Sequence, residues 1–188
     1  MNDTFYLMRH GHSQANKLGI ITCDPAVCLH EYGLTDKGRS QTADAVKRLK
    51  QSVKQAPIIV SSDFLRASQT AEIVAAEFAT SMILDDRLRE RDFGALHGQA
   101  DSNYAQVWDI TDKDPAAEPG GVESDRKILA RLVAVINEQE MAHKDQVVIL
   151  VSHGDPLVIL DAYYKYGDTT RQVHLFANAE IRPLAISK

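Results

Sequence analysis

The chain has 188 residues, of which 44% are hydrophobic and 25% are charged, and its formal net charge at pH 7 is −5. This composition is typical of one globular domain with a hydrophobic core, and the acidic balance argues against nucleic acid or an anionic membrane as a partner. The start, MNDT, lacks the features of a signal peptide, and no apolar run approaches the roughly 20 residues of a membrane span. We expect a cytoplasmic monomer or homodimer with a single domain over 1–188.

Three apolar runs in the first half of the chain predict buried strands. They lie at residues 5–8, 58–60 and 82–84. A long irregular loop is expected over 16–33, and a polar, glycine-punctuated segment follows the third strand over 87–98.

Two helical patterns separate these strands. The first helix is expected to begin at Thr35 or Asp36, residue types that cap helices, and to end near residue 51. The second is expected to begin at Ser62 or Asp63 and to end near residue 78.

The second half of the chain continues the alternation of strands and helices. We expect a short helix around 103–110, a long helix over 123–143, a strand over 147–151, a helix capped by Asp155 and started by Pro156, and strands over 173–176 and 180–186. This order predicts an α/β fold, namely a three-layer α/β/α sandwich around a mostly parallel sheet with an antiparallel edge strand.

Three of the predicted strands run directly into polar clusters. The clusters are Arg9-His10-Gly11, Ser61-Ser62-Asp63 with Arg66 nearby, and Ser152-His153-Gly154. In open α/β sheets, ligands bind outside the carboxyl ends of the strands. Arginine binds anions through paired N–H groups and imidazole can attack phosphorus, so the clusters together predict a site for a phosphoryl group. Taken alone, the first cluster favours a strand-end histidine beside a surface arginine.

Segments along nearly the whole chain resemble, in the right order, the motifs of the histidine phosphatase superfamily. This group contains cofactor-dependent phosphoglycerate mutases and many phosphomonoesterases. The segments are RHGHSQAN (9–16), LTDKGRSQ (34–41), SSDFLRASQTA (61–71), LRERDFGALHG (88–98), GGVES (120–124), VSHG (151–154) and NAEI (178–181). The resemblance implies a phosphoglycerate mutase-like fold, with a lid or insert at about 92–122.

The resemblance also implies roles for individual residues. By it, His10 is phosphorylated, and Glu90 acts as general acid and then as base for water. The phosphoryl oxygens would be held by Arg9, Arg66 and His153, with further hydrogen bonds from Ser13, Asn16 and the backbone N–H of Gly154. Cations placed in this way stabilise the charge that spreads over the oxygens in the transition state.

Glu90 has a second interpretation. Arg87, Arg89 and Arg91 flank it, so without the motif the residues would favour a surface ion-pair network over a catalytic acid. The context of the motif favours the acid.

We expect neither a metal nor another cofactor. His12 and His10 form a His-x-His pair of the kind that can begin a metal site, but the neighbouring arginines would repel a cation. Cys23 and Cys28 are expected to be reduced thiols, because disulfides are rare in a reducing cytoplasm. A structural zinc site is not expected, because it needs four ligands and there is no second cysteine pair.

The charge of the expected lid bears on the choice between hydrolase and mutase. A mutase must hold a second anionic group, yet the segment over 100–118 carries five acidic residues against Lys113 alone. The segment around Glu90 is nevertheless mutase-like. We expect a phosphomonoester hydrolase acting on a small phosphorylated metabolite; the alternatives are a 2,3-bisphosphoglycerate-dependent phosphoglycerate mutase and a non-catalytic phosphate-binding protein. Apolar residues in the first loop, including Leu18 and Ile21, suggest a partly apolar rim around the site, and hence a substrate with one phosphate on a weakly charged or apolar body.

Overall fold

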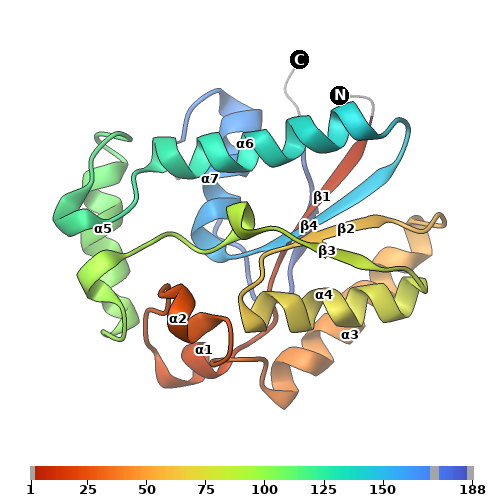
Figure 1. Cartoon of the computed structure of the whole chain (residues 1–188), viewed down its shortest axis with the longest axis horizontal. Coiled ribbons are helices and arrows are strands. Elements are labelled where there is room, and N and C mark those ends of the chain that lie inside the picture. Colours follow the sequence, from red (N-terminus) through yellow and green to blue (C-terminus); the bar gives the residue numbers. More distant parts are fainter. Residues whose placement is uncertain (1–2, 170–173, 186–188) are drawn as a thin grey trace.

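The computed structural model describes residues 3–169 and 174–185, and a five-stranded sheet lies at its centre (Figure 1). The strands are β1 (Thr4–Arg9), β2 (Ile58–Ser61), β3 (Met82–Leu84), β4 (Val147–Ser152) and β5 (Ile181–Pro183). Their order is β3-β2-β4-β1-β5, and neighbours pair in parallel except for β5, which runs antiparallel to β1 at one edge. The prediction of a mostly parallel sheet with an antiparallel edge strand is confirmed.

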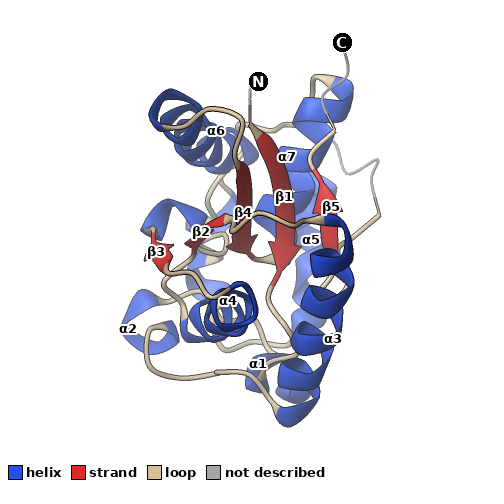
Figure 2. Cartoon of the chain, turned by 90° about the vertical axis from the view of Figure 1, so that its right-hand side faces the viewer, coloured by secondary structure: helices blue, strands red, loops and turns tan. Residues whose placement is uncertain are grey.

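Helices cover both faces of this sheet (Figure 2). One face packs against α6 (Asp125–Ala142) and α7 (Gly154–Tyr166), and the other against α3 (Asp36–Ser52) and α4 (Leu65–Phe78). The predicted three-layer α/β/α sandwich is therefore confirmed.

The central strand β4 shows why both faces are covered. Successive side chains of a strand point to opposite faces. Val148 and Leu150 join the core cluster with α6 and α7, whereas Ile149 and Val151 join the cluster with α3 and α4. Each of these four side chains is fully buried, as a continuous apolar run in a parallel sheet requires.

The loop expected over 16–33 contains two short helices, so that prediction was wrong in part. They are α1 (Gln14–Leu18) and α2 (Pro25–Cys28). A reciprocal capping box starts α1: Ser13 Oγ accepts from the Asn16 backbone N–H, and Asn16 Oδ1 accepts from the Ser13 N–H. Asp24 caps α2 by accepting from the backbone N–H of Ala26.

The caps of the long helices agree with the sequence only in the first case. Thr35 caps α3 and accepts from the Gly38 N–H at 3.1 Å, as predicted. The residue that precedes α4 is Phe64, so Ser62 and Asp63 were wrong as caps of that helix. Their side chains instead contact His153 and Arg89, which come from distant segments.

The helix after β4 also begins differently from the prediction. His153 precedes α7, and Asp155 lies inside its first turn rather than capping it. The buried Asp155 carboxylate forms an ion pair with Arg91. This long-range partner explains the error, because local capping rules do not include it.

The long helix predicted over 123–143 is found as α6, and the short helix predicted around 103–110 is found as α5 (Tyr104–Thr111). Of the two strands predicted last, the second is present as β5. Residues 174–176 are not in a strand, so the first was wrong there, and residues 173 and 186 lie outside the described residues. No helix among the described residues is both long and apolar enough to cross a membrane.

A separate hydrophobic cluster joins the segment over 92–122 to the first loop. It contains Ile21, Cys23, Phe93, Val107 and Val122. Ile21 is fully buried there, so the sequence was wrong in assigning it to an exposed apolar rim.

Candidate active site

The residues predicted to bind phosphate meet at the carboxyl ends of the parallel strands. Arg9 is the last residue of β1 and His10 follows it, Arg66 lies in the first turn of α4 after β2, and His153 follows β4. The ring centroids of His10 and His153 lie 5.2 Å apart, with a 60° angle between the planes. Both imidazoles and Arg66 are buried. The fold thus brings together side chains that are 143 positions apart in the chain.

The hydrogen bonds of His10 define its protonation. Its Nδ1 donates to the carbonyl oxygen of Gly11 at 2.8 Å, and its Nε2 accepts from Arg66 Nε at 3.3 Å. A carbonyl can only accept and a guanidinium can only donate, so the ring is neutral, with its lone pair on Nε2. Burial, followed by the charges of Arg66 and Arg9, holds the pKa of His10 well below its usual range.

His153 faces the same site from the other side. Its Nε2 lies 2.9 Å from Ser62 Oγ, and its Nδ1 is buried with no hydrogen-bond partner among the described residues. Burial first, then the charge of Arg66 and the neighbouring His10, lowers its pKa well below the usual range. Two neutral imidazoles therefore lie side by side in a buried site.

The two arginines are held in place by different means. Arg66 donates to the hydroxyl and the carbonyl oxygen of Thr22 at 3.1 and 3.0 Å, and its guanidinium lies over the ring of Phe64. Arg9 donates from Nη1 to the carbonyl oxygen of Phe176, while its buried Nε has no hydrogen-bond partner among the described residues. The Arg9 side chain lies beside Gly154, where a Cβ would be at ordinary van der Waals distance, 3.4 Å, from the guanidinium carbon.

The backbone beside His10 requires glycine at two positions, Gly11 and Gly38. A Cβ on Gly11 would lie 2.5 Å from the carbonyl oxygen of Gly38, and a Cβ on Gly38 would lie 2.1 Å from the carbonyl oxygen of His12. Only glycine permits this close approach of α3 to the loop that carries His10.

Ser13 and Asn16 are largely occupied by each other. The Ser13 hydroxyl donates to Asn16 Oδ1 at 3.1 Å, and the same oxygen accepts from Asn178 Nδ2 at 3.1 Å. Because its side-chain oxygen is used in this way, Asn16 has only its amide N–H groups to offer a ligand.

Glu90 is not part of the ion-pair network that its neighbours suggested. Among the described residues, Arg87 pairs with Asp85 and Glu138, and Arg89 pairs with Asp63. The Glu90 carboxylate instead accepts from the backbone N–H of Arg91 at 2.9 Å. Burial, and then the negative charge of Asp155, raise the pKa of Glu90 to about 7.

Arg91 has a role that the sequence did not reveal. Its side chain is completely buried and forms ion pairs with Asp125 of α6 and Asp155 of α7. It also donates to the carbonyl oxygen of Glu123 at 2.8 Å. These contacts attach the segment that carries Glu90 to two helices of the sandwich.

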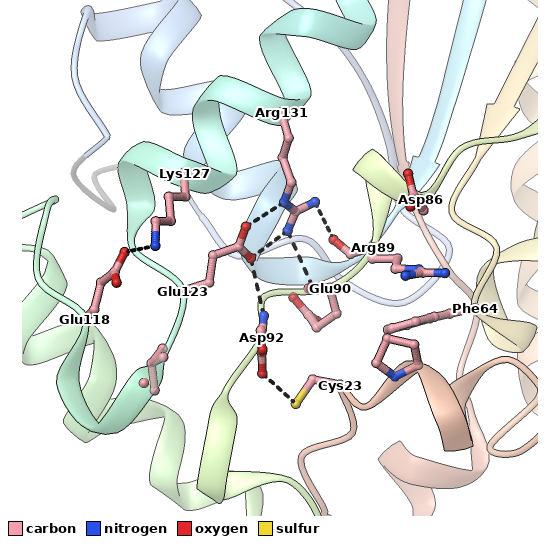
Figure 3. A pocket seen from close by; sticks show the side chains of 13 residues that line it. Cys23, Phe64, Asp86, Arg89, Glu90, Asp92, Glu118, Glu123, Lys127 and Arg131 are labelled. Atoms are coloured by element: carbon pink, nitrogen blue, oxygen red, sulfur yellow. Dashed lines mark hydrogen bonds and ion pairs between the residues drawn. The ribbon is translucent and has the colours of Figure 1, made fainter.

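Two cavities lie beside Glu90. The larger, of about 360 Å³, is shown in Figure 3. Its charged side chains are mostly paired: Lys127 with Glu118, Arg131 with Glu123, and Arg89 with Asp63. The smaller, of about 200 Å³, is lined by Arg9, Glu90, Tyr104, Trp108, Gly154, Asp155 and Leu175. It shares three residues with the predicted site.

Tyr104 and Trp108 were not among the site residues predicted from the sequence. They are four positions apart on α5, and side chains at that spacing lie on the same face of a helix. That spacing, in a segment expected to cover the site, was the available signal.

The other histidine and cysteine candidates lie outside this cluster. The half-buried His12 has its Nδ1 3.0 Å from the Thr35 hydroxyl. Cys23 and Cys28 are free, buried thiols. The described residues contain no group of three or more His, Cys, Asp and Glu side chains that could hold a metal.

The protein is thus of the α/β class with a mostly parallel sheet, and it has two buried histidines and two arginines at the carboxyl edge, where open α/β sheets bind ligands. The chain matches the model of the histidine phosphatase superfamily (branch 1) over residues 5–187, and it belongs to that family.

Named relatives include both mutases and mutase-like proteins. The chain is 30% identical over 155 residues to phosphoglycerate mutase-like protein 4 of Arabidopsis thaliana. This match covers 79% of this chain and 66% of that protein. It is 30% identical over 169 residues to the 2,3-bisphosphoglycerate-dependent phosphoglycerate mutase of Bartonella quintana. This second match covers 84% of this chain and 79% of that mutase. The chain thus spans about two thirds of the length of the first relative.

Solved structures with the same fold include hydrolases. Mycobacterial hydrolase 1 superposes with a TM-score of 0.80 at 25% identity, over 96% of this chain and 90% of that one. A mycobacterial glucosyl-3-phosphoglycerate phosphatase in complex with VO3 superposes with a TM-score of 0.82 at 24% identity, over 97% and 90%.

Proposed function

We propose that the protein is a phosphomonoester hydrolase that works through a phosphohistidine at His10. The observation that carries this proposal is the neutral, buried imidazole of His10, whose Nδ1 is fixed by Gly11 and whose Nε2 faces Arg66. Imidazole attacks phosphorus from an unprotonated nitrogen, and here that nitrogen is available at neutral pH.

In the first step, His10 Nε2 forms a bond to phosphorus and the ester P–O bond breaks. The departing alcohol oxygen takes the proton of Glu90, which burial keeps protonated in a large fraction of molecules near neutral pH. Arg9, Arg66 and His153 stabilise the charge on the three phosphoryl oxygens. Further hydrogen bonds to the phosphoryl oxygens would come from His153 Nδ1, the amide of Asn16 and the backbone N–H of Gly154.

In the second step, the Glu90 carboxylate takes a proton from water as the water oxygen attacks phosphorus. The bond between phosphorus and Nε2 breaks, inorganic phosphate leaves, and both His10 and protonated Glu90 are regenerated. Glu90 thus serves as acid and then as base, which requires a pKa near the working pH.

Two features favour hydrolysis over phosphoryl return to a second anionic substrate. Among the described residues that line the smaller cavity, Arg9 is the one basic residue, and that arginine is assigned to the transferred phosphoryl group. The helix α5 and the turns around it carry Asp101, Asp109, Asp112 and Asp114. A pure phosphate-binding role is disfavoured because binding needs no carboxylic acid with a pKa of about 7.

The direct test supplies alkyl and aryl monophosphates and measures release of inorganic phosphate together with trapped, acid-labile phosphoenzyme. We expect both, with no more than slight isomerisation of 3-phosphoglycerate in the presence of 2,3-bisphosphoglycerate. Isomerisation faster than phosphate release would instead establish a mutase. Binding of phosphate without turnover of any ester would leave only the non-catalytic role.

Replacing Glu90 by glutamine tests the proton donor. We expect kcat/KM for an alkyl phosphate to fall by about 10²- to 10⁴-fold, and for p-nitrophenyl phosphate by much less, because nitrophenolate leaves without protonation. The ratio kcat/KM is used because it reports the steps up to departure of the alcohol. Glu118→Gln, a glutamate of the larger cavity that pairs with the exposed Lys127, is the matched control and should retain both rates.

The same experiment has a pH dependence. Because Glu90 must be protonated to donate, kcat/KM for the alkyl ester should decline as pH rises through about 7. In Glu90→Gln this decline should be absent. Equal losses on the two esters, or an unchanged alkaline limb in the variant, would remove Glu90 from this role.

A further inference from the structure

The smaller cavity shares three lining residues with the site proposed for the phosphoryl group. Arg9, Glu90 and Gly154 line it on the side of the phosphate clamp. Tyr104 and Trp108 of α5 and Leu175 of the C-terminal segment form an apolar wall of the same cavity. A group that leaves toward Glu90 therefore enters a space with an apolar wall.

The two aromatic rings of this wall support each other. The rings of Tyr104 and Trp108 are stacked, with centroids 5.5 Å apart and planes only 5° from parallel. Tyr104 also meets the edge of Phe93 at 5.0 Å, and Phe93 is fully buried in the hydrophobic cluster beneath α5. Leu175 is 52% exposed, so it lies at the rim where a ligand could cover it.

The polar part of the lining does not favour a second anionic group. Arg9 is the basic residue there, and Glu90 and Asp155 are acidic. Burial, and then the charge of Glu90, raise the pKa of Tyr104, so its phenol stays neutral. A substrate body that carried a carboxylate would face these groups with no further cation among the described lining residues.

We propose that this cavity holds the alcohol part of the substrate and selects a phosphate monoester whose alcohol carries an uncharged planar ring. The inference rests on the proposed hydrolase function. A cavity of about 200 Å³ is large enough for one ring, since an apolar cavity of about 150 Å³ accommodates benzene. Stacking on the aromatic wall distinguishes a flat ring from a puckered one of similar size.

The test compares three esters of primary alcohols, whose leaving groups need the same help from Glu90. They are benzyl phosphate, cyclohexylmethyl phosphate and 3-phosphoglycerate. We expect kcat/KM for benzyl phosphate to exceed that for cyclohexylmethyl phosphate by about tenfold, and that for 3-phosphoglycerate by more. Equal values for the two ring esters, or a preference for 3-phosphoglycerate, would overturn the inference.

Two variants locate the selectivity. Trp108→Leu should reduce the benzyl-to-cyclohexylmethyl ratio toward one, and Leu175→Asp, a change at an exposed position, should lower benzyl phosphate turnover by placing a charge at the rim. Tyr163→Leu removes an exposed aromatic ring from the distal part of α7 and should keep the wild-type ratio. A ratio that survives both cavity variants would overturn the inference.

These outcomes are separable from failure of the proposed function. If the hydrolase proposal is wrong, the wild-type protein releases no phosphate from any ester and forms no phosphoenzyme. If only the present inference is wrong, phosphate is released and the phosphoenzyme forms, but the ring esters are not distinguished.

Discussion

His10→Ala is expected to abolish both ester hydrolysis and the phosphoenzyme, whereas His12→Gln is expected to retain both. Loss of a nucleophile removes the whole covalent route, so we expect kcat to fall by at least about three orders of magnitude. Quenched-flow trapping of labelled protein, followed by acid treatment, measures the phosphoenzyme directly.

The contrast between the two histidines rests on their surroundings. His10 is buried between Arg66 and His153, and hydrogen bonds define which of its nitrogens is free. His12 is only two positions away, but its Nδ1 lies against the Thr35 hydroxyl at the start of α3. Proximity in the sequence therefore does not place it on the phosphoryl site.

His153 offers a useful comparison within the same experiment. A stable phosphoenzyme in His10→Ala would mean that another residue accepts the phosphoryl group, and His153 is the other imidazole in the cluster. That result would contradict the assignment of His10. Folding of the variant can be checked by its far-UV circular dichroism and its urea midpoint, which should stay close to those of the wild type.

The side chains that were predicted to bind phosphate lie together, as the sequence analysis expected, because their positions follow from topology. Arg9 ends a parallel strand, Arg66 and His153 lie shortly after two others, and the carboxyl ends of parallel strands meet at one edge of the sheet. Strand prediction was therefore sufficient to bring these residues together. The order of the strands in the sheet, in contrast, depends on which helices pack on which face. The hydrophobic periodicity of the sequence does not predict that order.

The errors share a different physical cause. Ser62 and Asp155 have the residue types of helix caps, yet both side chains are used by partners more than 60 positions away. Ile21 was assigned to a rim because it lies in a loop, but it packs beneath α5. Local rules predict the role that a residue type prefers within its own segment, such as capping a helix. They cannot predict which distant segment will contact its side chain.

The buried Arg91 is the clearest case of such a partner, and its removal is expected to have the largest effect on stability. Arg91→Met should lower the free energy of unfolding by about 3–5 kcal/mol, because Asp125 and Asp155 would remain buried without their cation. Urea unfolding at neutral pH measures the change. Arg126→Met, at an exposed position on the same helix as Asp125, should change stability by no more than about 0.5 kcal/mol.

The origin of this loss can be separated from the loss of packing. If unpaired carboxylates are responsible, adding Asp125→Asn to Arg91→Met should recover part of the stability, although Asp125→Asn alone should be destabilising. A methionine that simply packs badly would leave the double variant no better than the single one. A loss in Arg91→Met as small as that in Arg126→Met would show that the buried ion pairs contribute little. The recovered double variant should still hydrolyse alkyl esters slowly, because the segment that carries Glu90 would no longer be tied to α6 and α7 through Arg91.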